Sequence, residues 1–297
     1  MELRHRIQAS YLAVVVIWST TPLAIQWSAT QVDYLFGVTA RMVIGLVISL
    51  ILLRVMGLSL RGERRAVLTY LAAGLGIYGA MICVYWGAQY IPSGWISVLF
   101  GLTPIVTGIM ARRFLGEQAL SGMRLVGVFL GIAGLVTVFW GSLHFSPTAW
   151  LGVAALMASV TLHSASTVWT KAIGWQGHGL EITAGALVVA VPLYLISWML
   201  FGEQWPDAVP VKAALSIVYL GSVATVLGFG AFYYVLRHVD ATRVALLTLM
   251  TPIIALWLGR WLNGEELTWT VMAGTGLILS GLTLYEFGER KSRHAAA

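Results

Sequence analysis

The sequence predicts an all-α membrane protein with ten transmembrane helices, built as two inverted five-helix repeats over residues 1–145 and 146–297. Three observations predict this fold. Hydrophobic residues make up 59% of the 297 residues and charged residues only 10%, whereas a soluble domain carries about 25% charged residues. Lys and Arg gather in alternate connections between the apolar segments, and part of the first half recurs in the second. A soluble α-helical protein with a large core is therefore a poor interpretation.

The apolar segments give the number of helices, because a helix needs about 20 apolar residues to cross a bilayer. Residues 66–111 and 125–170 contain no Asp, Glu, Lys or Arg, and each run is long enough for two spans. Pro92 and Gly94 predict a turn in the first run, and residues 141–147 interrupt the second. Single spans are predicted at 9–28, 34–53, 180–201, 213–236, 243–262 and 268–287. The first span is too long and too rich in Trp for a cleavable signal peptide.

The basic residues orient these spans, because Lys and Arg accumulate on the cytoplasmic side of a membrane. If the N-terminus is inside, the cytoplasmic segments hold most of the 18 Lys and Arg residues. These are Arg4, Arg6, Arg54, Arg61, Arg64, Arg65, Arg112, Arg113, Arg124, Lys171, Arg237, Arg243, Arg290, Lys291 and Arg293. The outer segments keep only Lys212 and Arg260, and Arg41 falls within a span. A missed helix would reverse every later connection, so we predict that both termini are cytoplasmic.

A shift of 148 residues superimposes part of the first half on the second without a gap. The matching residues are Tyr85 and Tyr233, Thr103-Pro104-Ile105 and Thr251-Pro252-Ile253, Arg112 and Arg260, and Gly116-Glu117 and Gly264-Glu265. Because each half has an odd number of spans, the second half would enter the membrane upside down. Inverted repeats are typical of secondary transporters, whose substrate site lies near the membrane midplane between the halves.

The first span with Trp18, the two Thr-Pro segments and the two Gly-Glu pairs resemble the EamA repeats of the drug/metabolite transporter (DMT) superfamily. The resemblance covers nearly the whole chain as two EamA repeats. It implies a multi-pass protein of the cytoplasmic (inner) membrane of a bacterium, with both termini cytoplasmic. It also implies a secondary transporter that moves small metabolites, amino acids above all, by alternating access and in the direction of export.

Arg41 is the candidate for binding a substrate carboxylate. It lies about seven residues into the second span, where an arginine costs about 2.5–3.5 kcal/mol. No Asp or Glu lies in the interior of a predicted span, and Asp33, two turns back, is the nearest acid. Arg41 would either face the cavity and meet a substrate carboxylate, or it would turn outward or cap helix carbonyls. Without a buried carboxylate, lipophilic cations are not expected as the main substrate.

His163 is the one histidine inside a predicted span. It could relay a proton, since its pKa lies near neutrality, but a neutral ring bonded to a helix carbonyl is the simpler interpretation. Aromatic residues deep in the spans would either line a substrate pocket or fill helix contacts. The predicted substrate-binding set is Trp18, Arg41, Tyr78, Tyr85, Trp86, Phe100, His163, Trp169, Phe229 and Tyr233.

Prolines and glycines are predicted to shape the helices. Pro22, Pro104 and Pro252 lie inside spans, where each removes a backbone hydrogen bond and favours a kink, so they are candidate hinges. The glycines of spans five and ten are expected to allow close helix packing. Glu117 and Glu265, at span ends, are expected to orient loops or to pair with nearby arginines.

Other classes of protein are weighed against the same residues. No HExxH, GxSxG or phosphate-loop motif occurs, so neither an enzyme nor an ATPase is expected. The basic residues are scattered, so no nucleic acid partner is expected, and neither a metal nor a cofactor is predicted. The expected partners are a small-molecule substrate and the lipid bilayer, with a homo-oligomer left open. An importer, a broad-specificity carrier, a channel and a structural membrane protein remain alternatives.

Overall fold

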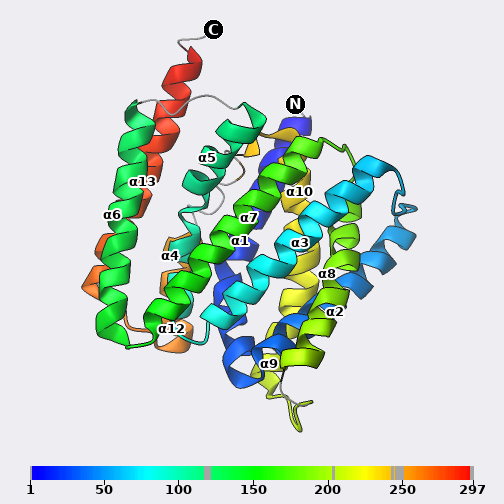
Figure 1. The fold of residues 1–297 in the computed structure, drawn as a ribbon, viewed down its shortest axis with the longest axis horizontal. Helices are drawn as coiled ribbons and strands as arrows, with labels where there is room; N and C mark the ends of the chain where they lie inside the picture. Colours follow the sequence, from blue (N-terminus) through cyan, green and yellow to red (C-terminus); the bar gives the residue numbers. More distant parts are fainter. Residues whose placement is uncertain (1, 117–121, 203–204, 242–243, 245–250, 295–297) are drawn as a thin grey trace.

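The structure is a computed structural model that describes residues 2–116, 122–202, 205–241, 244 and 251–294. All secondary structure within these residues is helical (Figure 1). In chain order, the helices are α1 (Glu2–Gln31), α2 (Tyr34–Val55), α3 (Arg64–Gly87), α4 (Ser93–Phe100), α5 (Thr103–Leu115), α6 (Gly122–Phe145), α7 (Ala149–Ile173), α8 (Gly179–Phe201), α9 (Val211–Tyr219), the π-helical segment η1 (Leu220–Phe229), α10 (Gly230–His238), α12 (Thr251–Asn263) and α13 (Trp269–His294).

Seven segments of the described chain are long and apolar enough to cross a membrane. Two of them are composite: α4 and α5 form one, and α9, η1 and α10 form another. The protein is therefore a multi-pass helical membrane protein. Helices are found within each of the ten predicted ranges, although most of the first half of the range 243–262 lies outside the described residues.

The predicted repeat is visible in local geometry. The helices α5 and α12 each contain 13 residues and begin at the two Thr-Pro motifs. Both are followed by a glycine in the left-handed region, Gly116 with φ 67° and Gly264 with φ 66°. A side chain is disfavoured there because its Cβ would approach the following carbonyl. Thr-Pro and glycine therefore set the start and the end of the same short helix in each half.

The prolines differ from the expectation in one respect. Pro104 was expected to kink a continuous span, but the chain leaves the helix between Phe100 and Thr103, and Pro104 belongs to the first turn of α5. Pro252 has the equivalent place in α12. A proline costs little in a first turn, because its missing N–H would have no partner inside the helix. Only Pro22 among the three predicted hinges lies within a continuous helix, α1.

Helices from the two halves pack against each other. The helix α3 contacts α7 and α8, α2 contacts α8 and η1, and α6 lies along α13 (Figure 1). Glycines permit the last contact: a Cβ atom on Gly134 would lie 2.6 Å from the Gly274 carbonyl oxygen, and one on Gly281 would lie 2.5 Å from that of Gly127. Gly276 has no neighbour within 4 Å, so it does not share this role.

Helix α1 begins and α13 ends at the same end of the bundle, which we call the terminal end; the opposite end is the distal end (Figure 1). Side chains cap helices at both ends of the bundle. Asp33 accepts a hydrogen bond from the Phe36 amide at the start of α2, over 3.1 Å. At the start of α8, the Glu181 carboxylate accepts from the His178 amide while the His178 ring accepts from the Leu180 amide. These caps satisfy amides that have no partner inside the helix.

Candidate substrate site

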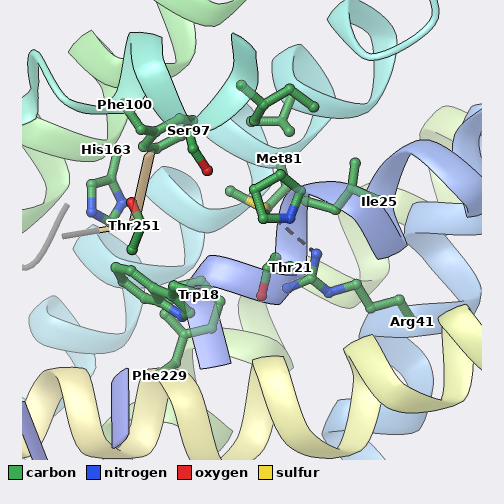
Figure 2. Close-up of a pocket in the computed structure, with 13 residues that line it drawn as sticks. Trp18, Thr21, Ile25, Arg41, Met81, Ser97, Phe100, His163, Phe229 and Thr251 are labelled. Carbon is green, nitrogen blue, oxygen red and sulfur yellow. Dashed lines mark hydrogen bonds between the residues drawn. The ribbon is translucent and has the colours of Figure 1, made fainter. Parts of the chain in front are cut away.

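A cavity of about 70 Å³ lies where helices of both halves meet (Figure 2). Its walls come from α1, α2, α3, α4, α7, η1 and α12. The lining residues are Trp18, Thr21, Pro22, Ile25, Arg41, Met81, Val84, Ile96, Ser97, Phe100, His163, Phe229 and Thr251. Most of these side chains are apolar or aromatic, as in pockets that bind small organic molecules.

Arg41 supplies the positive charge of the cavity. The residue is only 2% exposed. Its Nε donates to the Thr225 hydroxyl oxygen over 3.0 Å, and its Nη1 lies 4.0 Å from the Met81 sulfur. Asp33, the nearest acid in the sequence, caps α2 instead. Among the residues that the structure describes, Arg41 therefore has no carboxylate partner, and its Nη2 has no hydrogen-bond acceptor.

Aromatic rings enclose another part of the cavity. The Trp18 ring meets those of His163, Phe229 and Phe232 at centroid distances of 6.1, 5.8 and 5.2 Å. His163 also faces Phe100 at 6.2 Å and Phe232 at 5.5 Å. The expected hydrogen bond from His163 to a helix carbonyl is not found within the described residues. The His163 ring is surrounded instead by the rings of Trp18, Phe100 and Phe232.

The charged group and the aromatic group lie apart. Figure 2 shows Arg41 on one side of the cavity, with His163 and Phe100 on the other. Figure 2 shows the hydroxyl groups of Thr21 and Ser97 between them, and Thr251 beside His163. The Thr21 hydroxyl donates to the Ile17 carbonyl oxygen over 2.9 Å, so its oxygen remains available as an acceptor. A solute here would meet a cation at one end and ring faces at the other.

The structure gathers part of the predicted substrate-binding set. Trp18, Arg41, Phe100, His163 and Phe229 line the cavity, and so does the predicted hinge Pro22. Residues 104 and 252, the other predicted hinges, are not among the lining residues.

The remaining predicted residues lie elsewhere. The Tyr78 hydroxyl bonds to that of Ser197 over 2.7 Å, and Tyr85 is fully buried in the core. The Trp86 ring lies against Tyr90, and Tyr233 is buried against Phe229 and Phe232. Trp169 is 67% exposed on the outer face of α7, away from the cavity.

Several lining residues were not predicted from the sequence. Thr21 and Ile25 lie three and seven residues after Trp18 on α1, on the same helix face, so the position of Trp18 would have identified them. Met81, Val84, Ile96 and Ser97 carry no comparable signal. Thr251 belongs to the repeated Thr-Pro motif, which indicates an internal repeat but does not predict that Thr251 lines a cavity. Phe232 was missed although it contacts both Trp18 and His163.

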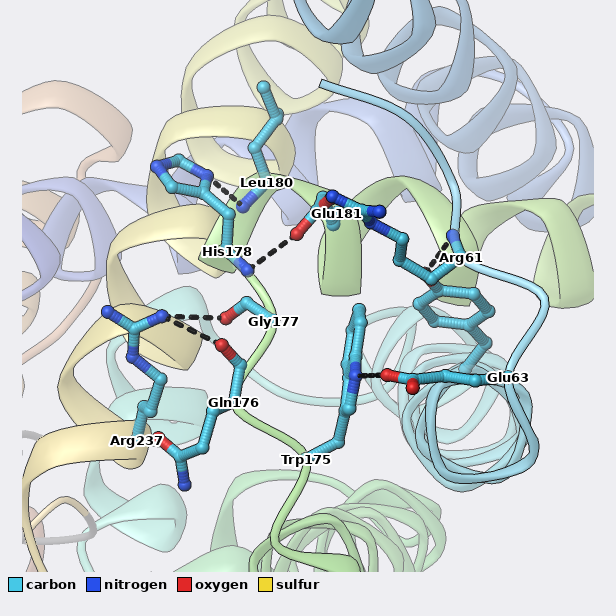
Figure 3. A network of polar contacts seen from close by, with 10 residues as sticks. Arg61, Glu63, Trp175, Gln176, Gly177, His178, Leu180, Glu181 and Arg237 are labelled. Atoms are coloured by element: carbon cyan, nitrogen blue, oxygen red, sulfur yellow. Dashed lines mark hydrogen bonds and ion pairs between the residues drawn. The ribbon is translucent and has the colours of Figure 1, made fainter.

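At the terminal end, a polar network joins the α2–α3 connection to the α7–α8 connection (Figure 3). The Trp175 indole donates to the Glu63 carboxylate, and Arg61 Nε lies 3.8 Å from Glu181 Oε1. Arg237 Nη1 donates to the carbonyl oxygens of residues 176 and 177, over 3.1 and 3.0 Å. The network joins connections from the two halves of the chain.

A second network lies at the distal end. The Glu265 carboxylate accepts from the amide and hydroxyl of Ser93, over 3.0 and 2.6 Å, and from the Gly94 amide over 3.1 Å. Asn263 Nδ2 donates to the same carboxylate over 3.0 Å. Glu265 thus follows α12 in sequence but caps the N-terminus of α4, as well as orienting its own loop. Arg260 Nη1 donates to the Glu265 carbonyl oxygen over 3.5 Å, and within the described part of the chain no ion pair joins Arg260 to the Glu265 carboxylate. Glu117 lies outside the described residues.

The described residues contain no group of three or more His, Cys, Asp or Glu side chains that would hold a metal ion. The cavity lies between helices of the two halves, which is where secondary transporters bind their solutes.

The chain belongs to the EamA-like transporter family, whose profile matches residues 8–140 and 150–286. This confirms the resemblance seen in the sequence, with two EamA repeats. The family consists of transporters rather than enzymes.

Similar proteins carry related names. An "Uncharacterized transporter" of Archaeoglobus fulgidus is 29% identical over 70% of this chain and 74% of its own. A "Probable amino-acid metabolite efflux pump" of Salmonella typhimurium is 28% identical over 69% of this chain and 71% of its own. A solved crystal structure shares the fold with a TM-score of 0.71 and 18% identity, over 94% of this chain and 96% of that one.

Proposed function

We propose that this protein is a secondary carrier that exports small solutes bearing a carboxylate, amino acids among them, across the cytoplasmic membrane of a bacterium. The observation that carries the proposal is Arg41, a buried cation at the wall of a cavity without a carboxylate partner among the described residues. An arginine at membrane depth costs several kcal/mol unless it serves a substrate pathway or finds a partner. A carboxylate on the solute is the partner that the cavity lacks.

The geometry around Arg41 favours such a partner. The Thr225 hydroxyl holds Nε and so fixes the plane of the guanidinium. The Nη2 group is left for an acceptor, and arginine binds carboxylates through paired, charge-assisted hydrogen bonds. Of the relatives, the Salmonella typhimurium protein is named for efflux of amino-acid metabolites, which supports both the solute class and the direction.

Alternating access is the proposed mechanism, with residues 1–145 and 146–297 as two inverted five-helix halves and both termini cytoplasmic. The cavity of about 70 Å³ is smaller than the roughly 300 Å³ at which ligand pockets begin. Helices must therefore separate to admit a solute. The repeated short helices α5 and α12, with Pro104 and Pro252 in their first turns, and Pro22 in α1 are candidate pivots.

Counterflow in proteoliposomes tests this function. We expect saturable, stereoselective exchange of labelled amino acids and related carboxylates, with at least a tenfold loss in Arg41→Gln. Arg54→Gln is the matched control, because Arg54 lies on the same helix but is exposed at its end. Non-saturable flux without stereoselectivity would instead indicate a channel. Preloaded cells that overproduce the protein should lose solute faster than control cells, whereas faster uptake would assign import.

A further inference from the structure

The charges around the cavity are unbalanced. Arg41 is the only Lys, Arg, Asp or Glu among the described residues that line it. Two acids near the lining residues in sequence serve elsewhere: Asp33 caps α2, and Glu265 caps α4. Among the described residues, a solute that enters this space therefore meets one positive charge and no negative one.

This imbalance distinguishes two kinds of carboxylate. A zwitterionic amino acid has no net charge, so its binding leaves the site with the positive charge of Arg41, and its ammonium group meets no carboxylate. Among the described lining residues, the acceptors near Arg41 are neutral oxygens such as those of Thr21 and Ser97. A monoanion cancels the charge of Arg41 completely. Burial of an ion without an opposite charge is strongly unfavourable, so the second arrangement is favoured.

The aromatic end of the cavity specifies the rest of the solute. Trp18, Phe100 and Phe229 present ring surface to the cavity on the side away from Arg41 (Figure 2). Burial of an apolar side chain there removes apolar surface from water, which favours binding. A solute that spans the cavity is thus a carboxylate joined to an apolar or aromatic tail.

We propose that the site selects monoanionic carboxylates with an apolar or aromatic tail and without an ammonium group, such as 2-oxo acids and N-acylated amino acids, over the amino acids that carry the same side chain. This inference rests on the proposed function, since it takes the cavity as the substrate site and Arg41 as the carboxylate ligand. It narrows the solute class from carboxylates in general to net anions.

Matched pairs of probes test the proposal on the wild-type protein. Isothermal titration of the detergent-purified protein would compare phenylpyruvate and N-acetyl-L-phenylalanine with L-phenylalanine, and 4-methyl-2-oxopentanoate with L-leucine. We expect each anion to bind at least tenfold more tightly than its amino acid. Equal or tighter binding of the amino acids would overturn the charge rule. The same result would still agree with the proposed function if binding of the amino acids depends on Arg41.

Variants connect the preference to Arg41. In Arg41→Gln, the affinity for the anions should fall at least tenfold and the preference over amino acids should disappear, while Arg54→Gln keeps both. Arg41→Lys retains the charge and should keep the preference for anions, which guards against a variant that fails because it misfolds. A preference that survives Arg41→Gln in folded protein contradicts the inference. Absence of any Arg41-dependent flux of these carboxylates in proteoliposomes would overturn the proposed function as well.

Discussion

Glu265→Gln is the perturbation with the most direct structural consequence, because this carboxylate caps a helix in the other half of the chain. It accepts three hydrogen bonds from Ser93 and Gly94 at the start of α4, at 2.6–3.1 Å. A glutamine keeps one acceptor oxygen, which can still serve Ser93. Its amide NH₂ would face the Gly94 amide, so that two donors would oppose each other.

The expected cost follows from these contacts. Hydrogen bonds to charged groups contribute about 1.5–3 kcal/mol each, and neutral ones about 0.5–1.5. A negative charge at a helix N-terminus contributes about 0.3–1 kcal/mol more. Because Glu265 is partly exposed, solvent weakens these contributions, and we expect the substitution to lower the free energy of unfolding by about 2 kcal/mol. At about 2–4 °C per kcal/mol, the midpoint of thermal unfolding should fall by about 4–8 °C.

Thermal unfolding of the detergent-purified protein, followed by tryptophan fluorescence at one scan rate, measures this loss. Glu266→Gln is the matched control, because it removes the same charge from the next residue, which is exposed and caps no helix. We expect the control to change the midpoint by less than about 2 °C, as surface substitutions usually do. If the two variants unfold at the same temperature, the cap on α4 contributes nothing and the reasoning is wrong.

Three further predictions concern other parts of the molecule. Gly264→Ala should destabilise the protein by about 1–2 kcal/mol because φ is 66° there, while Gly276→Ala, in a helix with no neighbour within 4 Å, should not; unfolding midpoints compare them. Arg61→Ala should cost less than about 1 kcal/mol, since its side chain is 64% exposed, whereas Glu181→Ala removes a helix cap and should cost about 1–2 kcal/mol in the same assay. His163→Ala should change the apparent affinity for solute but leave the response of flux to a pH gradient intact; a flux that no longer responds would make His163 a proton relay.

The helices could be predicted because hydropathy and turn chemistry are local properties. Charge-free runs located α3 to α5 and α6 to α7, and the Thr-Pro and Gly-Glu motifs marked both short helices of the repeat. The sequence did not show that the chain breaks at residues 101–102. The position of Pro104 within an apolar span predicts a kink. The sequence does not reveal that a new helix starts just before this proline.

The site could be predicted only in part, for a geometric reason. Arg41 was identified because a charge in an apolar span is costly wherever it points. Aromatic residues give no such signal, since depth along a helix does not say which face a ring occupies. Trp18 and Trp169 both lie deep in predicted spans, yet Trp18 faces the cavity while Trp169 is 67% exposed.

The sequence by itself determined the class of the protein, because membrane insertion, helix length and the internal repeat follow from composition and order along the chain. The tertiary structure alone decided which residues meet. It placed Arg41 of α2 beside Thr225 of η1, and it brought Trp18 and His163 to the same cavity from different halves. Contacts between residues more than 140 positions apart depend on how helices rotate and cross, and that is set by the packing of all their side chains together.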